Sequence, residues 1–183
     1  MIRMSRWFCV LLIWILIAPA VWARGVYQDP EDFISEVFSG KAPPPSLLQI
    51  SEDEQKQIRE ILGHKLGAGR VRYWQHEDRT VWILEEIGKE RPITVGLVVD
   101  KGKLELIKVL IFRESRGSEV RYPFFTDQFK GASLGEDGQL DRNIDGVSGA
   151  TLSTRALTKL ARLALYLHQQ REQADVTGQT SPR

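Results

Sequence analysis

Hydrophobic and polar residues alternate along the middle of the chain, the pattern of β-strands with one buried face. The alternation starts at residue 70, where Val71 and Tyr73 are separated by arginines. Runs rich in β-branched and large apolar residues follow at 80–87, 92–99 and 104–112. The polar turns between them, at 76–79 and 100–103, are short enough for hairpins. We therefore predict four antiparallel strands in chain order.

Helical spacing of apolar residues flanks this region on both sides. Ser51 followed by Glu54 forms a capping box, and a helix is predicted from there to Gly63. Short helices are predicted at 30–38 and within the Phe-rich segment 122–131. A long helix is predicted from about residue 152 to 171, and its arginine and lysine residues fall on a solvent-facing side (Arg155, Lys159, Arg162). The fold class is α+β, an antiparallel sheet of four to six strands with packed helices.

The two ends of the chain differ in character from the middle. Residues 1–23 combine two arginines, an apolar run and a small-residue stretch ending at Ala23, which is typical of a secretory signal peptide. An uncleaved anchor is the alternative, although the apolar run is shorter than the about 20 residues that a spanning helix needs. Residues 24–50 are interpreted as an N-terminal segment and Pro-rich linker. Residues 172–183 lack an apolar pattern and are predicted to be disordered.

Charge and composition exclude several kinds of partner and site. The chain has 183 residues and a net charge of +1, so no general electrostatic argument favours nucleic acid as a partner. Its one cysteine, Cys9, lies in the predicted leader, so the exported protein would have no disulfide, thiolate metal site or cysteine nucleophile. The three histidines have no ligand spacing, and we predict no metal site.

Small and hydroxyl-bearing residues crowd together in the segment 145–154, which reads DGVSGATLST. The long helix follows at once. A helix N-terminus offers free N–H groups and a partial positive charge, so it holds phosphates well. The other interpretation is a plain N-cap made by Ser148 or Thr151.

This segment closely resembles the flavinylation motif of the covalent FMN-binding domain family. That family includes flavin-carrying components of the sodium-pumping NADH:quinone reductase and of the Rnf complex, and many small exported flavoproteins. The turn at 100–103, Glu114 and the segment 128–131 also resemble the family layout, so the resemblance covers about 91–170 within a predicted FMN-binding domain at 51–171. The chain departs from the respiratory members at 114–117, where Glu-Ser-Arg-Gly replaces a Glu-Thr-Pro-Gly-type loop.

The resemblance implies that Thr151 carries FMN through a phosphoester bond and that a separate flavin transferase attaches it, using FAD and a divalent metal. The implied cofactor-binding set is completed by the motif residues Asp145, Ser148, Gly149, Ala150, Leu152, Ser153 and Thr154. Asp145 is expected to orient the loop or to help the transferase, because its charge would repel a phosphate. Tyr122, Phe124 and Phe125 are candidates to line the flavin ring, and Arg116 or Arg121 to lie near it.

The leading functional prediction is an exported electron carrier, periplasmic or membrane-associated, that exchanges electrons with membrane or periplasmic redox partners. No residues resemble a nicotinamide site or a substrate base, which makes an independent catalyst the less favoured interpretation. The alternatives are a flavin-dependent reductase of a small extracellular acceptor and a cofactor-free binding module of the cell envelope.

Overall fold

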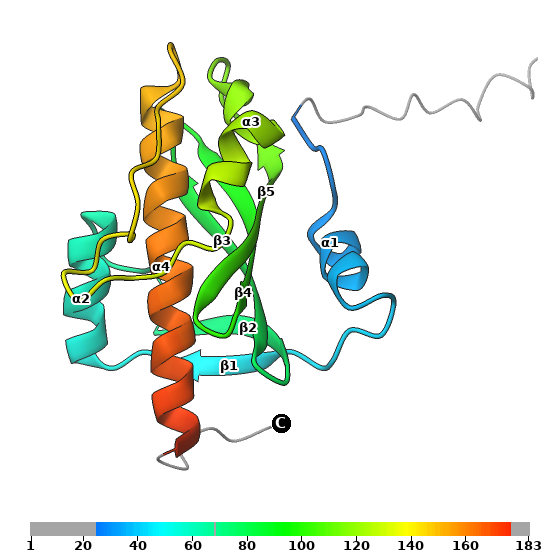
Figure 1. The fold of residues 1–183 in the computed structure, drawn as a ribbon, viewed down its shortest axis with the longest axis vertical. Helices are drawn as coiled ribbons and strands as arrows, with labels where there is room; N and C mark the ends of the chain where they lie inside the picture. The colour runs from blue at the N-terminus through cyan, green and yellow to red at the C-terminus, as the bar shows by residue number, and fades with distance from the viewer. Residues whose placement is uncertain (1–24, 68, 177–183) are drawn as a thin grey trace, which may run out of the picture.

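A five-stranded antiparallel sheet with helices on both faces organises the computed structural model, which describes residues 25–67 and 69–176. The strands pair in chain order: β1 (Ser46–Gln49), β2 (Arg70–His76), β3 (Arg79–Ile87), β4 (Pro92–Asp100) and β5 (Lys103–Phe112). The helices are α1 (Pro30–Val37), α2 (Glu52–Leu62), α3 (Pro123–Thr126) and α4 (Thr151–Val176), with 3₁₀ turns η1 (Ser118–Arg121) and η2 (Asp127–Phe129). Figure 1 shows α2 and α4 on one side of the sheet and α1 on the other. The predicted α+β class is confirmed.

The four strands expected from the alternation are present, and both hairpin turns lie where they were predicted. Glu77 turns the chain between β2 and β3 with φ 53°, and the β4–β5 turn places Lys101 at φ 50° and Gly102 at φ 71°. The capping box of α2 is also present, since Ser51 Oγ accepts from Glu54 N and Glu54 Oε2 accepts from Ser51 N.

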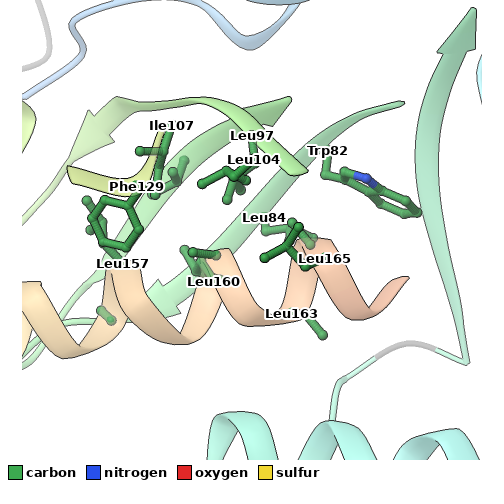
Figure 2. Close-up of a cluster of buried hydrophobic side chains, with 14 of the residues drawn as sticks. Trp82, Leu84, Leu97, Leu104, Ile107, Phe129, Leu157, Leu160, Leu163 and Leu165 are labelled. Carbon is green, nitrogen blue, oxygen red and sulfur yellow. The ribbon is translucent and has the colours of Figure 1, made fainter. Parts of the chain in front are cut away.

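The main core lies between the sheet and the pair α2 and α4. Figure 2 shows Leu157, Leu160 and Leu165 of α4 pointing toward sheet side chains such as Leu84 and Leu97, all of which are buried. Trp82 is fully buried in the same core and stacks on Tyr73 with ring centroids 5.0 Å apart. The long helix is thus fixed to the sheet, and its first residue has a defined place.

The solvent-facing side predicted for α4 is only partly correct. Arg155 is exposed, but Lys159 Nζ donates to the Leu62 carbonyl and Arg162 Nε donates to the Gly138 carbonyl at 2.6 Å. These two side chains satisfy the carbonyl at the end of α2 and one in the loop after η2. They bind α4 to its neighbours instead of facing only water.

The opposite face of the sheet is covered by α1, in a smaller core of its own. Phe33 and Ile34 pack there against Val81, Val98 and Leu110. The chain before α1 follows the edge of β5, since Val26 bridges Ile111. The interpretation of 24–50 as a segment and linker outside the domain is therefore wrong for most of its length. β1 lies inside that range as well and pairs with β2.

The prediction of a disordered tail from residue 172 is wrong for its first five residues, because α4 continues to Val176. The last turns carry a buried His168, whose Nε2 lies 3.3 Å from Glu172 Oε1. Residues 177–183 and the predicted leader, 1–23, lie outside the described residues. Within the described ranges, no helix has both the length and the apolar character needed to cross a membrane.

Candidate functional site

A cleft of 620 Å³ opens where α4 begins, beside the end of β5 and the turn between β3 and β4. Its volume lies in the range of small-molecule and cofactor sites. One wall is the start of α4 and the turn before it, and the other is formed by residues after β5 and in the β3–β4 turn. The lining residues are Lys89, Glu114, Ser115, Arg116, Gly149, Ala150, Thr151, Leu152 and Ser153.

The first wall is a turn that leads directly into a helix N-terminus. Ala150 N donates to Val147 O at 2.9 Å, and Gly149 takes φ 79°, a left-handed conformation that favours glycine. Thr154 N makes the i to i−4 bond to Ala150 O at 2.8 Å. The N–H groups of residues 151–153 therefore precede the regular helix bonds and can be offered to an anion.

Side chains hold the preceding loop in place. Asp145 N donates to Gln128 Oε1 at 2.7 Å, and Gln128 Nε2 donates to Asp145 O at 3.3 Å. The Asp145 carboxylate is exposed, accepts from Asn143 Nδ2 at 3.3 Å and does not line the cleft. Gln128 therefore holds the loop by the backbone of Asp145, while the Asp145 carboxylate stays outside the cleft.

The four hydroxyls of the motif are in different environments. Thr154 is buried and its Oγ1 accepts from Val147 N at 3.4 Å. Ser153 is 4% exposed, while Ser148 and Thr151 are exposed. Ser148 is not part of the cleft wall. Thr151 is therefore the hydroxyl that is both exposed and in the cleft.

The second wall is held together by Glu114. Its Oε1 accepts backbone N–H bonds from Lys89, Glu90 and Arg91 at 2.5, 2.7 and 2.9 Å. Partial burial acts to raise the pKa of Glu114, but the three N–H donors outweigh it, and the pKa is lowered from its ordinary value. The carboxylate thus stays ionised and keeps the β3–β4 turn against the segment after β5.

Basic side chains dominate the charge that this wall presents to the cleft. Lys89 and Arg116 both line it and are exposed, while the Glu114 carboxylate is engaged by backbone donors. Arg116 was one of the two basic residues expected near a flavin. The other, Arg121, does not line the cleft: its guanidinium lies 4.4 Å from the Tyr27 ring centroid and 4.3 Å from that of Tyr122.

The aromatic residues expected to line a flavin ring do not form the cleft wall. Phe125 is fully buried and meets Phe129 edge-on in the main core, with centroids 5.5 Å apart. Tyr122 and Phe124 are exposed and stack on each other at 6.3 Å, outside the lining of the cleft. Helical spacing of aromatics could not distinguish the buried side of this segment from the exposed one.

Sequence reasoning missed Lys89 and Ser115 as parts of the site. Lys89 lies 62 positions before Thr151 and reaches the cleft because Glu114 binds its backbone. The one available signal was Glu114 itself, which the sequence singled out without showing its partners.

Comparison with known proteins relates this chain to FMN-binding domains. Residues 88–166 match the family model of the FMN-binding domain. The structure is similar to the crystal structure of NqrC from Shewanella oneidensis, with a TM-score of 0.51 and 16% sequence identity, over 75% of this chain and 87% of that one. At this identity the likeness concerns the fold alone. No curated protein sequence matches the chain.

Proposed function

We propose that the protein is an exported electron carrier that holds FMN covalently through a phosphoester bond to Thr151, because residues 88–166 match the family model of the FMN-binding domain. The similar fold of NqrC supports this proposal. The cleft offers a cofactor-sized space, and the one carboxylate in its lining, Glu114, uses Oε1 to accept three backbone N–H bonds that hold the β3–β4 turn. A carrier therefore fits the site better than an independent catalyst.

The observation that carries the proposal is the placement of the Thr151 hydroxyl. It lies at the first residue of α4, exposed and in the cleft, while Ser153 and Thr154 are buried and Ser148 is outside the cleft wall. A separate modifying enzyme must reach its target side chain from solvent, so accessibility favours Thr151 over Ser153, the other motif hydroxyl that lines the cleft.

The donor set suits an FMN phosphate. A phosphodiester keeps one negative charge, which the N–H groups of residues 151–153 and the positive end of the α4 dipole stabilise. Gly149, with no side chain, leaves the backbone open to close approach. When bound, FMN supplies reversible uptake and release of electrons. The protein's part is to hold the phosphate at one end of the cleft and to present charged side chains along the rest.

The proposed partners and location follow from the same mode of attachment. A flavin transferase loads Thr151, using FAD and a divalent metal. The leader at residues 1–23 supports export to the periplasm or an equivalent compartment, at or near a membrane. A covalent link suits such a place, because a loosely held cofactor would be lost to dilution. Membrane or periplasmic redox proteins would then exchange electrons with the flavin.

Intact mass spectrometry after co-expression with a flavin transferase tests the attachment. The wild-type protein should gain the mass of one FMN adduct, and Thr151→Val should gain none. Ser148→Ala is the matched control, since it removes an exposed hydroxyl three residues away and should keep the adduct. A bare wild-type mass, or an adduct that survives Thr151→Val, would contradict the proposal. The same spectra report whether the leader is cleaved after Ala23.

Redox assays separate the carrier from the alternatives. A carrier should show reversible flavin reduction without steady turnover of a soluble donor and a small acceptor. Steady turnover by the purified protein would instead make it a reductase. A protein that folds normally but stays colourless with transferase and FAD would make the motif a plain helix cap.

A further inference from the structure

Two cationic side chains face the same opening as Thr151 from the other wall of the cleft. Lys89 comes from the turn between β3 and β4, and Arg116 from the segment after β5. In the part of the chain that the structure describes, Lys89 forms one ion pair, an exposed one with Glu90 at 3.3 Å, and Arg116 forms none.

The position of Lys89 depends on Glu114. The Glu114 carboxylate accepts the N–H groups of three successive residues, 89 to 91, so it fixes the backbone that carries the Lys89 side chain. The fit is close: a Cβ at Gly88 would lie 2.9 Å from Glu114 Oε1. The turn therefore packs closely against the acceptor at 114.

The segment that carries Arg116 also contacts the opposite wall. Gly117 has φ 86°, and a Cβ there would lie 2.8 Å from Ser153 Oγ and 3.3 Å from the Ala150 Cβ. Segment 114–117 thus touches the β3–β4 turn at one end and the start of α4 at the other. This contact sets the distance between the two cations and the Thr151 wall.

We propose that Lys89 and Arg116 stabilise the negative charge that FMN gains on reduction, with Glu114 as the residue that positions Lys89. This rests on the proposed function, since a phosphate at Thr151 leaves the opposite wall for the remainder of the cofactor. Reduction would take two electrons from an external reductant such as dithionite and one proton from solvent, so the reduced cofactor would carry one more negative charge than the oxidised one. Lys89 and Arg116 would balance that charge and so disfavour uptake of a second proton.

The midpoint potential of the FMN-loaded protein, titrated with dithionite and mediators at several pH values, tests the two cations. One proton per two electrons gives a slope of about 30 mV per pH unit near neutrality, since a tenfold change in a two-electron equilibrium is about 30 mV. Lys89→Gln and Arg116→Gln should each lower the equilibrium constant for reduction about tenfold, the scale of one charge interaction in a half-open cleft. Arg91→Gln is the control, since its side chain leaves the same turn outside the cleft lining and should change the constant by less than about twofold.

Two substitutions of Glu114 isolate its positioning role. Both Glu114→Gln and Glu114→Ala remove the negative charge, but Gln keeps an acceptor for the backbone N–H groups and Ala does not. The Ala variant should therefore have a lower potential than the Gln variant, by about the effect of Lys89→Gln. With Lys89→Gln already present, the two variants should have the same potential. In the cofactor-free protein, nuclear magnetic resonance should show the amides of residues 89–91 losing their hydrogen-bonded shifts in Glu114→Ala alone.

The outcomes separate this proposal from the attachment to Thr151. If mass spectrometry finds no covalent adduct, the same titrations are run with saturating free FMN, and the potentials still report on the cations. Equal potentials for Lys89→Gln, Arg116→Gln and Arg91→Gln would refute the proposal even in a fully flavinylated protein. A slope of about 60 mV per pH unit across the neutral range would also refute it, because two protons would then neutralise the reduced ring.

Discussion

The contact between α1 and the sheet predicts the effect of one added methyl group. Gly96 lies in the middle of β4, opposite Ile83 on β3 and Lys108 on β5. The Phe33 ring of α1 covers it so closely that a Cβ at Gly96 would lie 2.4, 2.7 and 2.7 Å from three ring carbons. Carbon atoms in contact are normally about 3.5 to 4 Å apart. Gly96→Ala must therefore displace α1 by about 1 Å or distort β4.

The magnitude follows from two opposing terms. Overpacking a filled core costs about 1–3 kcal/mol, and replacing glycine by alanine recovers about 0.4–1 kcal/mol from the unfolded chain. We expect Gly96→Ala to lower the free energy of unfolding by about 1–2 kcal/mol. Phe33→Ala alone should cost about 3–5 kcal/mol, because the Phe33 side chain is fully buried. In the Phe33→Ala protein the added methyl group has space, so Gly96→Ala should there leave the free energy of unfolding unchanged or raise it slightly.

Urea unfolding of the four proteins of this double-mutant cycle measures the coupling. Gly67→Ala serves as the control for chain entropy, since nothing lies within 4 Å of a Cβ there. It should leave stability unchanged or raise it slightly. An equal cost of Gly96→Ala with and without the Phe33 ring would refute the contact, and with it the conclusion that α1 is an integral part of the domain.

Three further outcomes are expected. Ser51→Ala should lower the free energy of unfolding, measured with urea, by about 1 kcal/mol, and adding Glu54→Ala should lower it little further, because the two side chains form one capping box. Fully additive losses would contradict a shared capping box. Burial lowers the pKa of His168 below its ordinary 6.5. The stability that neutral His168 contributes is therefore complete above about pH 6.5, and it is lost as pH falls toward the lowered pKa. His168→Gln should flatten that acid-side loss, and an unchanged pH profile would contradict the assignment. The pKa of His64 is shifted in the opposite direction, because its hydrogen bonds to the Lys65 carbonyl and, second, to Glu86 raise it. The stability that protonated His64 contributes is therefore complete below pH 6.5 and is lost as pH rises through the raised pKa. Glu86→Gln should bring the His64 pKa, measured by nuclear magnetic resonance, back toward 6.5.

Local patterns were sufficient to predict most elements of the fold. The capping box, the αL glycine at 63 and the hairpin turns each depend on residues within four positions of one another, so the sequence shows them directly. β1 was missed because its four residues carry no strand pattern of their own, and they become a strand by pairing with β2. The end of α4 was missed because residues 172–176 carry no apolar pattern, although α4 continues through them.

The two walls of the cleft also differ in how far the sequence could predict them. The wall at 149–153 is one continuous segment, and its helix N-terminus and exposed Thr151 could be predicted from the motif. The other wall is assembled from Lys89 and residues 114–116, joined through backbone N–H groups that any residue except proline provides. Such a contact leaves no compositional signal at the donor positions. The aromatic prediction failed because packing, and not spacing, decides that Phe125 enters the core while Phe124 stays exposed.

The proposed covalent attachment of FMN would change what the site must do. The loop that precedes Thr151 has few backbone pairs of its own, and Arg142 donates to the carbonyls of Lys130 and Gly131 at 2.9 Å each, while Gln128 holds Asp145. All of these restraints come from the protein, so the start of α4 does not depend on a ligand for its conformation. An exposed acceptor hydroxyl in an open cleft is accessible to the proposed flavin transferase, and the proposed tether would supply the effective concentration that a deep pocket would otherwise provide. Under this proposal the cleft could stay open to redox partners, and its remaining side chains would set the charge around the cofactor instead of its affinity.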